Sequence, residues 1–273
     1  SFSNYIHLKF PSLVIYISND RSEIAMSTWG LFKTLSSKSR LVVIDVLETG
    51  PHRYSEIMRI SGLNTTDLSR QLTRLIKDSI IEKDSSDLYQ LTQFGRLVMT
   101  AIPMGSFLIE YQGYFNTHDL SIIPSNLIED ISSLRKGNMV SSVYESINLQ
   151  RNVIPTIQER FWMLTDDLSS SWTSSIQSLL EHDVEIQAIV TPDLAEKIKQ
   201  EATPIIKEKM HVRTMDSVPL VLGYSDKHSL ICFPNLDGDP DRNHYLFGYD
   251  AVFRHWVFHC FRYFWEQATP FHL

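Results

Sequence analysis

The stretch Pro51-His-Arg-Tyr-Ser-Glu-Ile-Met-Arg-Ile-Ser-Gly-Leu-Asn-Thr-Thr-Asp-Leu-Ser-Arg-Gln-Leu-Thr-Arg-Leu-Ile-Lys-Asp-Ser-Ile-Ile81 decides the fold of the N-terminal part of this chain. Its apolar residues predict a short helix over Ser55–Ile60. Gly62 can end that helix in a turn, because glycine adopts a positive φ at low cost. Asn64 is a favourable N-cap residue, so a second helix is predicted to begin there.

A β-hairpin is predicted after the second helix. The apolar runs Ile80–Lys83 and Leu88–Leu91 are typical of strands, and Asp84–Asp87 would form the turn between them. Thr92 is a suitable N-cap for a further helix. Two helices joined by a tight turn and followed by a hairpin are typical of a winged helix-turn-helix, whose second helix enters the major groove of DNA. We therefore expect DNA binding.

The second helix has one apolar and one polar face. Leu68, Leu72, Leu75 and Ile76 recur at helical spacing and are predicted to be buried. The opposite face is small, polar and basic, which suits contacts with bases and phosphates. The predicted DNA-binding residues are Thr65, Thr66, Ser69, Arg70, Thr73, Arg74 and Lys77 on the helix, and Lys83 on the wing. The alternative is an ordinary solvated surface helix.

From about Leu31 onwards the chain resembles the archaeal winged-helix regulators of the methanogenesis-regulator type. The residues that carry this resemblance are Leu31-Phe-Lys-Thr-Leu-Ser-Ser-Lys-Ser-Arg-Leu-Val-Val-Ile-Asp-Val-Leu47, Asp119-Leu-Ser-Ile-Ile-Pro124 and Asp250-Ala-Val-Phe-Arg-His-Trp-Val-Phe-His-Cys-Phe-Arg-Tyr-Phe-Trp265. The resemblance implies a cytoplasmic, dimeric transcription factor with a C-terminal regulatory domain and no catalytic activity. It does not identify a ligand.

Three regions are expected: an N-terminal extension over 1–27, a winged helix-turn-helix domain over 28–116, and a regulatory domain over 117–273. A first helix is predicted over Trp29–Glu48, and a long helix over Thr92–Phe115 that Pro103 should kink or split. Its aromatic end is a candidate dimer or interdomain contact, or else it caps the domain core. These aromatic residues are Phe107, Tyr111, Tyr114 and Phe115.

The regulatory region alternates strands and helices, which predicts an α/β domain with a central mixed sheet whose last strands pair antiparallel. Strands are expected at Met139–Tyr144, Arg160–Leu164, Val184–Val190, Met210–Met215, Leu220–Tyr224 and Leu230–Pro234. Helices are expected at Ser125–Leu134, Asn148–Gln158, Ser169–His182, Pro192–Glu201 and Ala251–Gln267.

The formal net charge is −7, but the charge is unevenly distributed. Residues 28–111 carry ten basic and nine acidic side chains, whereas residues 112–273 carry thirteen and twenty-one. The predicted DNA-binding domain is therefore only locally basic, and its non-specific affinity should be modest. The apolar stretch Ile6–Ile17 is too short to span a membrane.

No motif indicates catalysis, a metal or a cofactor, and we expect none of the three. The order of elements in the C-terminal half resembles phospholipase D-like sensor domains, but the His-x-Lys signature is missing, since His211 is followed by Arg213. Asp237–Asp241 is better explained as a turn than as a calcium loop. The two cysteines, Cys232 and Cys260, are expected to be buried thiols, and a disulfide between them remains an alternative.

Many aromatic residues gather near the C-terminus, and a largely buried last helix explains most of them. The functional alternative is an effector pocket in which rings are accompanied by anion-binding groups. The candidate residues for this pocket are Trp162, Tyr224, Arg242, His244 and Arg254.

The sequence thus predicts a homodimeric transcriptional regulator. Its winged helix would bind a pseudo-palindromic operator, and its C-terminal domain would bind a small effector or mediate assembly. A phospholipase D-like hydrolase with an accessory winged domain, and an assembly module whose winged domain binds protein, remain alternatives.

Overall fold

The computed structural model describes residues 9–10, 13–14, 27–142, 151–168 and 170–273. The chain divides into two compact units, Ser1–Ile102 and Pro103–Leu273. The expected boundary, at 116/117, lies further along the chain. The difference arises because Phe107 packs into the core of the second unit, together with Leu127 and Trp256. The predicted extension over 1–27 lies mostly outside the described residues, apart from a short antiparallel pair, β1 (Lys9–Phe10) and β2 (Leu13–Val14).

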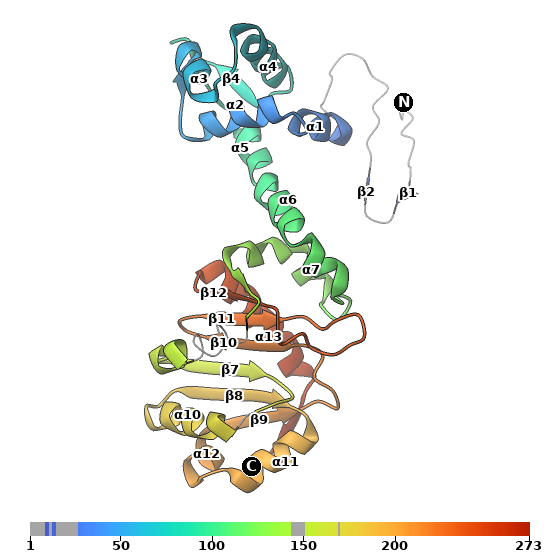
Figure 1. Ribbon diagram of the computed structural model, residues 1–273, viewed down its shortest axis with the longest axis vertical. Helices are drawn as coiled ribbons and strands as arrows, with labels where there is room; N and C mark the ends of the chain where they lie inside the picture. Colours follow the sequence, from blue (N-terminus) through green and yellow to red (C-terminus); the bar gives the residue numbers. More distant parts are fainter. Residues whose placement is uncertain (1–8, 11–12, 15–26, 143–150, 169) are drawn as a thin grey trace, which may run out of the picture. The chain divides into compact units, whose positions relative to one another are not determined.

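The first unit is a winged helix-turn-helix (Figure 1). Its elements are α1 (Thr28–Leu35), α2 (Lys38–Glu48), β3 (His52–Arg53), α3 (Tyr54–Ser61), α4 (Thr65–Lys77), β4 (Ile81–Lys83), β5 (Leu88–Leu91) and α5 (Gln93–Met99). The three short strands form an antiparallel sheet in the order β3-β5-β4. Helices and hairpin therefore follow one another as the sequence predicts.

The local signals that mark the ends of α3, α4 and α5 are confirmed. Gly62 ends α3 with a φ of 67°. The Asn64 side chain caps α4 by accepting the backbone N–H of Asp67 at 2.9 Å. Thr92 Oγ1 accepts the N–H of Gly95 at 2.8 Å and so caps α5.

Three expectations for this unit were wrong. The helix predicted over Trp29–Glu48 is two helices, because the chain turns between Leu35 and Lys38. Strand β3 was not predicted. Ile76 was assigned to the buried face of α4, but 42% of its surface is exposed. Gln71, which was not expected to be buried, has an exposed fraction of only 4%, and its Oε1 accepts a hydrogen bond from Arg40 Nη1 at 3.2 Å.

The second unit is built on an eight-stranded mixed sheet, in the order β13-β9-β8-β7-β10-β11-β12-β6. Its strands are β6 (Asn138–Val140), β7 (Arg160–Leu164), β8 (Glu185–Val190), β9 (Met210–Thr214), β10 (Val221–Ser225), β11 (Ser229–Cys232), β12 (Tyr245–Gly248) and β13 (Thr269–Phe271). Strands β7, β8 and β9 run parallel, and the other neighbours pair antiparallel. The mixed sheet and the antiparallel late strands are as expected.

The remaining elements of this unit are α-helices and short 3₁₀ helices, the latter labelled η. They are α6 (Ala101–Glu110), whose first two residues precede the division between the units, α7 (Gln112–Thr117), α8 (Ser125–Glu129), η1 (Ile131–Lys136), η2 (Ile154–Thr156), α10 (Ser170–Glu181), α11 (Pro192–Glu201), α12 (Pro204–Lys209) and α13 (Ala251–Gln267).

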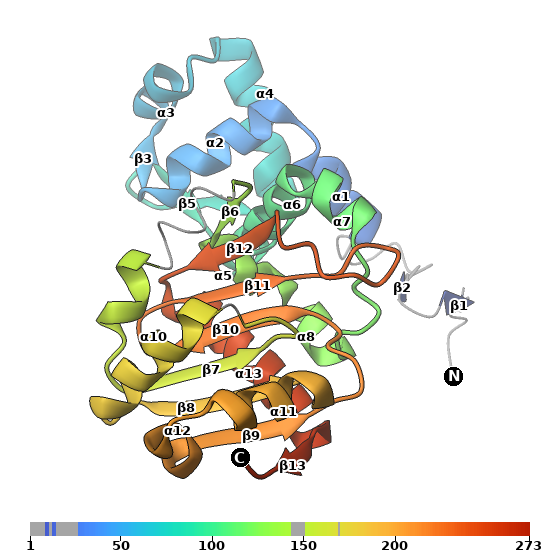
Figure 2. The ribbon, with the colours of Figure 1, turned by 60° about the horizontal axis from the view of Figure 1, so that its bottom comes forward.

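The two faces of the sheet are covered by different helices. Helix α13 lies against one face, and α10, α11 and α12 lie against the other (Figure 2). Successive side chains of β7 alternate between them, as expected for a strand. Trp162 and Leu164 pack with Phe261 of α13, whereas Phe161 and Met163 belong to the core that includes Leu180 of α10. Both faces are therefore hydrophobic.

Several expected elements differ in extent. The predicted helix Thr92–Phe115 is three helices, α5, α6 and α7, and Pro103 lies in the first turn of α6, where proline is tolerated. Elements α12, β12 and β13 were not predicted. The predicted strand Met139–Tyr144 and helix Asn148–Gln158 extend into residues 143–150, which lie outside the described residues; residues 151–153 are helical.

The turn between β10 and β11 is held by buried polar groups. Ser225 Oγ donates to the carbonyl of His228 at 2.8 Å and accepts the N–H of His228 at 3.0 Å. Asp226 Oδ1 accepts the backbone N–H groups of Gln158 and Glu159, each at 3.2 Å. Burial lowers the pKa of His228 to about 4, so the imidazole is neutral near pH 7.

Gly95 marks the closest approach of α5 to the hairpin, and we predict that Gly95→Ala destabilises the first unit. A Cβ there would lie 2.0 Å from the carbonyl oxygen of Ile80, so the backbone must shift, at a cost of about 1–3 kcal/mol in the free energy of unfolding. Gly105→Ala is the matched control, because a Cβ in α6 meets nothing within 4 Å and should be neutral or stabilise by up to ~1 kcal/mol. Urea unfolding followed by circular dichroism compares them, and equal stabilities would contradict the prediction.

We also predict that acid weakens the second unit through His228. Its folded pKa, about 4, lies below the ordinary 6.5. The stability that it contributes is therefore fully present above pH 6.5 and is lost as the pH falls towards 4. In His228→Phe the loss of unfolding free energy between pH 7 and pH 5 should be smaller than in the wild type. His182→Gln, at an exposed residue, should keep the wild-type loss. Identical losses in wild type and His228→Phe would refute this.

Candidate nucleic-acid interface and effector cavity

Helix α4 exposes a face of hydroxyl and cationic side chains. Leu68, Leu72 and Leu75 turn inward. The exposed residues of α4 are Thr65, Thr66, Ser69, Arg70, Thr73, Ile76 and Lys77. Six of the eight predicted DNA-binding residues are thus exposed on this helix. This face has the small, polar and basic character that direct contact with a groove requires.

Local hydrogen bonds orient several of these side chains. Tyr54 Oη donates to the carbonyl of Thr65 at 2.9 Å and lies 3.0 Å from Ser69 Oγ. Thr73 Oγ1 donates to the carbonyl of Ser69 at 2.8 Å. Arg70 pairs with Asp67 at 2.8 Å, yet its side chain is 72% exposed. Arg70 therefore keeps donor groups available to a ligand, because a guanidinium carries five N–H groups.

Arg74 is placed differently from the other cations of α4. Its Nε lies 2.9 Å from Asp78 Oδ2, and the Asp78 side chain is only 8% exposed. Thr34 of α1 also donates to Asp78. The three residues tie the end of α4 to α1. The sequence offered no signal for this contact, since Thr34 and Asp78 are 44 residues apart.

The wing contributes little free positive charge. Lys83 pairs with Asp87 at 2.6 Å, and this hydrogen bond raises the pKa of Lys83. The lysine also lies 5.5 Å from the ring centroid of Tyr89. Of the eight predicted DNA-binding residues, Arg70, Arg74 and Lys83 therefore pair with carboxylates, whereas Lys77 is exposed on α4.

The five residues proposed for an effector pocket do not form one site. Trp162 and Tyr224 are opposite each other on β7 and β10, with ring centroids 5.4 Å apart, and they face α13. Arg254 donates to the carbonyls of Tyr249 and Asp226 at 3.2 and 2.9 Å. Trp162 and Tyr224 therefore pack in the core, and Arg254 stabilises the hairpin of β10 and β11 through the carbonyl of Asp226.

Arg242 and His244 lie in the loop between β11 and β12. Arg242 pairs with Asp166, which follows β7. His244 Nδ1 lies 2.8 Å from Asp241 Oδ2, and His118 Nε2 lies 3.2 Å from the same oxygen. Burial would raise the pKa of Asp241, but these hydrogen bonds hold it below its usual value. One carboxylate thus joins two histidines from distant parts of the chain.

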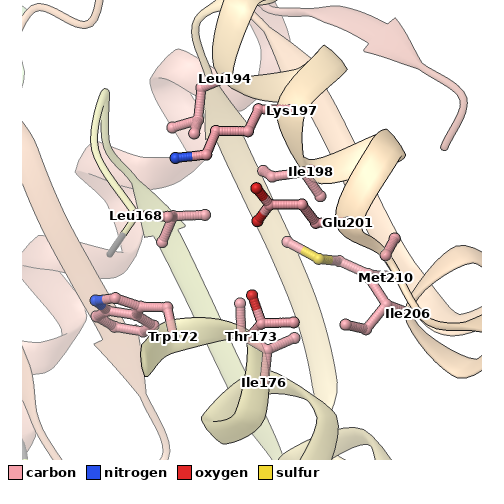
Figure 3. A pocket seen from close by; sticks show the side chains of 11 residues that line it. Leu168, Trp172, Thr173, Ile176, Leu194, Lys197, Ile198, Glu201, Ile206 and Met210 are labelled. Carbon is pink, nitrogen blue, oxygen red and sulfur yellow. The ribbon is translucent and has the colours of Figure 1, made fainter. Parts of the chain in front are cut away.

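The described residues of the second unit line several hollows, three of which bear on function. One of about 30 Å³ lies between α10, α11 and α12 and has Lys197 and Glu201 among its lining residues (Figure 3). Its volume is that of about one water molecule in the liquid. A broader hollow of about 720 Å³ is lined partly by α7 and includes His118, Asp241 and His244. The third, about 250 Å³, includes Arg242.

The described residues contain no group of three metal-ligating side chains. Cys232 and Cys260 are both free and buried, and burial raises the pKa of Cys232 to about 12, which keeps it as a thiol. His211 and Arg213 lie in strand β9, and Arg213 donates to the carbonyls of Trp265 and Ala268 at 2.7 and 3.3 Å.

The expected turn around Asp237–Asp241 is present, with Gly238 at a φ of 96°. Within the described residues no helix has the length and apolar character needed to cross a membrane.

Residues 144–267 match the family model described as methanogenesis regulatory protein FilR1, middle domain. No curated protein matches the chain. Among solved structures, TrmBL2, described as an archaeal chromatin protein with a novel mode of DNA binding, is 13% identical over 86% of this chain and 94% of its own, with a TM-score of 0.42.

Two further solved structures are similar to shorter parts of the chain. The transcriptional repressor BigR from Xylella fastidiosa is 30% identical over 26% of this chain and 76% of its own, with a TM-score of 0.25. Nuc from Salmonella typhimurium, a phospholipase D family member, is 10% identical over 50% of this chain and 98% of its own, with a TM-score of 0.39. TM-scores of this size do not establish a shared overall fold.

The family match covers most of the second unit, and the winged helix-turn-helix described above precedes it. The resemblance expected from the sequence is therefore confirmed: a winged helix-turn-helix precedes residues 144–267, which match the model of the middle domain of the methanogenesis regulatory protein FilR1.

Proposed function

We propose that this protein is a transcriptional regulator that binds operator DNA through α4. The observation that carries the proposal is the exposed face of that helix, where the hydroxyls of Thr66, Ser69 and Thr73 accompany the cations of Arg70 and Lys77. Side chains of these types read base edges and hold phosphates. A regulator acting on the DNA of an archaeal cell works in the cytoplasm.

Arg70 and Lys77, the exposed cations of α4, have different roles in this proposal. Arg70 lies in the middle of the helix and reaches a base edge, whereas Lys77 lies at its C-terminal end and contacts a phosphate. Arg74 acts as a positioning residue, because its link to Asp78 fixes the end of α4. The small number of free cations implies few phosphate contacts and a shallow dependence of affinity on salt.

The protein acts as a homodimer in this proposal, and α1 and α5 supply the contact with the second copy. Trp29 and Phe32 on α1 are 73% and 61% exposed, and Leu97 on α5 is 70% exposed. Large apolar side chains exposed on two helices are a feature of association surfaces. The aromatic residues of α6 and α7 are less suited to this role, because they pack into the core of the second unit.

The second unit binds a small effector in this proposal. The effector would alter DNA binding only if its affinity differs between two arrangements of the dimer. The 250 Å³ cavity beside Arg242 supports this role, since it combines apolar walls with a charged residue.

DNA binding is tested with the duplex from upstream of the protein's own gene and a scrambled duplex, across a salt series. Arg70→Ala should weaken binding to the upstream duplex by about tenfold or more, corresponding to roughly 1–3 kcal/mol, and reduce the preference for it. Lys77→Ala should weaken binding to both duplexes and lower the log–log salt slope by about one.

Lys38→Ala is the control, because it removes an exposed cation from α2, which lies outside both α4 and the proposed dimer contact. If it weakens binding as much as Arg70→Ala, α4 is not the reading helix. If the wild type prefers neither duplex at any salt concentration, the better hypothesis is an assembly module whose winged domain binds protein instead of DNA.

Dimerisation is tested by sedimentation of Leu97→Glu and Trp29→Glu. Each change introduces a charge that must be desolvated in the proposed contact, so both variants should sediment as monomers at concentrations where the wild type is a dimer. Leu236→Glu, at an equally exposed residue of the second unit (70%), should remain dimeric. The proposed contact would be overturned if the wild type sediments as a monomer. It would also be overturned if both Trp29→Glu and Leu97→Glu sediment as dimers.

A further inference from the structure

The 250 Å³ cavity lies on the face of the sheet opposite α13. Phe161 and Met163 of β7 reach it, whereas their neighbours Trp162 and Leu164 face α13. Helix α10 contributes Trp172, and Arg242 comes from the loop after β11. This cavity is therefore distinct from the cluster of Trp162 and Tyr224 that the sequence suggested.

The interior of the cavity is apolar and carries no formal charge near neutral pH. Phe161 and Trp172 stack nearly parallel, with centroids 5.7 Å apart. A Cβ at Gly223 would already be in van der Waals contact with Leu230 and Phe161, at 3.5 and 3.7 Å, so a larger side chain there would take up part of the cavity. The low pKa of His228 and the raised pKa of Cys232 keep both groups neutral. Such an interior suits an aromatic ring.

Opposite charges mark the mouth of the cavity. Among the described residues that line it, Asp167 and Arg242 are exposed, whereas the others are buried or half-buried. Arg242 gives a hydrogen bond to Asp166, and its guanidinium has further donors in a fixed plane that matches a carboxylate. Asp167 adds a second carboxylate, so the mouth offers partners to both an anion and a cation.

We propose that this cavity binds an aromatic α-amino acid, with the ring inside, the carboxylate on Arg242 and the ammonium group on Asp167. This inference names a ligand class for the effector role in the proposed function. Only the expected effect of the ligand on DNA binding rests on that proposed function. A volume of about 250 Å³ is slightly below the roughly 300–1,000 Å³ of drug-sized pockets, which suits one or two rings.

The same loop connects the cavity to the helices that lead to the winged domain. Asp241 precedes Arg242, and its carboxylate is bonded to His118, the residue that ends α7. The thiol of Cys232, which lines the cavity, donates to the carbonyl of Asp241. A ligand bound to Arg242 therefore lies next to Asp241, which holds the end of α7 through His118. Helix α7 follows α5 and α6 along the chain.

Calorimetric titration of the full chain with three related compounds tests the proposal without DNA. L-Phenylalanine has the ring and both charges, 3-phenylpropionate lacks the ammonium group, and phenethylamine lacks the carboxylate. L-Phenylalanine should bind at least about tenfold more tightly than either analogue, since each charge-assisted hydrogen bond contributes roughly that factor or more.

Two variants assign the charges. Arg242→Gln should reduce the affinity for L-phenylalanine to that for phenethylamine, because the carboxylate no longer has its partner. Asp167→Asn should reduce it to the affinity for 3-phenylpropionate. Gly223→Val fills the cavity and should weaken all three ligands. Arg262→Gln removes a cation from α13, where it pairs with Glu266, and should leave all three affinities unchanged.

Absence of binding by all three compounds, or an unchanged preference for L-phenylalanine in both Arg242→Gln and Asp167→Asn, would overturn the proposal. Tighter binding of phenethylamine than of L-phenylalanine would identify the site as an amine site and also reject it. In a second arm, L-phenylalanine should shift the affinity for the upstream duplex in the wild type and not in Arg242→Gln. Ligand binding without DNA binding would reject the proposed function and leave the site itself standing.

Discussion

A sheet that is apolar on both faces must be covered on both, and this constraint organises the second unit. Helix α13 lies against one face, with Trp256, Phe261 and their neighbours in its core. Helices α10 to α12 cover the parallel strands on the other face. The 250 Å³ cavity lies beside β10 and β11, next to the cluster of Val153, Cys232 and Tyr245. Burial of both faces of the sheet thus accounts for the packing of the described helices around it.

The first unit depends on a second buried interaction at the end of α4. Asp78 is largely buried, and it satisfies both the hydroxyl of Thr34 and the guanidinium of Arg74. Removing one member of such a group leaves the others buried without partners, which costs more than the bond itself contributes. The position of α4, and with it the direction of its exposed face, therefore depends on this contact with α1 as well as on the buried leucines of α4.

In the loop between β11 and β12, two consecutive residues contact different parts of the second unit. Asp241 holds His118 at the end of α7, and Arg242 reaches Asp166 at the end of β7. Coupling between a ligand and a distant helix requires an element that both can bias. Within the second unit this loop contacts both the end of α7 and the lining of the 250 Å³ cavity.

The sequence by itself determined the elements whose signals are local. The cap at Asn64, the positive φ of Gly62, the limits of α13 and the alternation of strands and helices depend on residues a few positions apart, so they could be predicted. The exposed face of α4 followed from the same periodicity. The partners of Arg74 and Arg242 could not be predicted, nor could the face of the sheet on which the cavity lies. Those features join residues such as Thr34 with Asp78, or Asp166 with Arg242, whose approach is decided only when the chain packs.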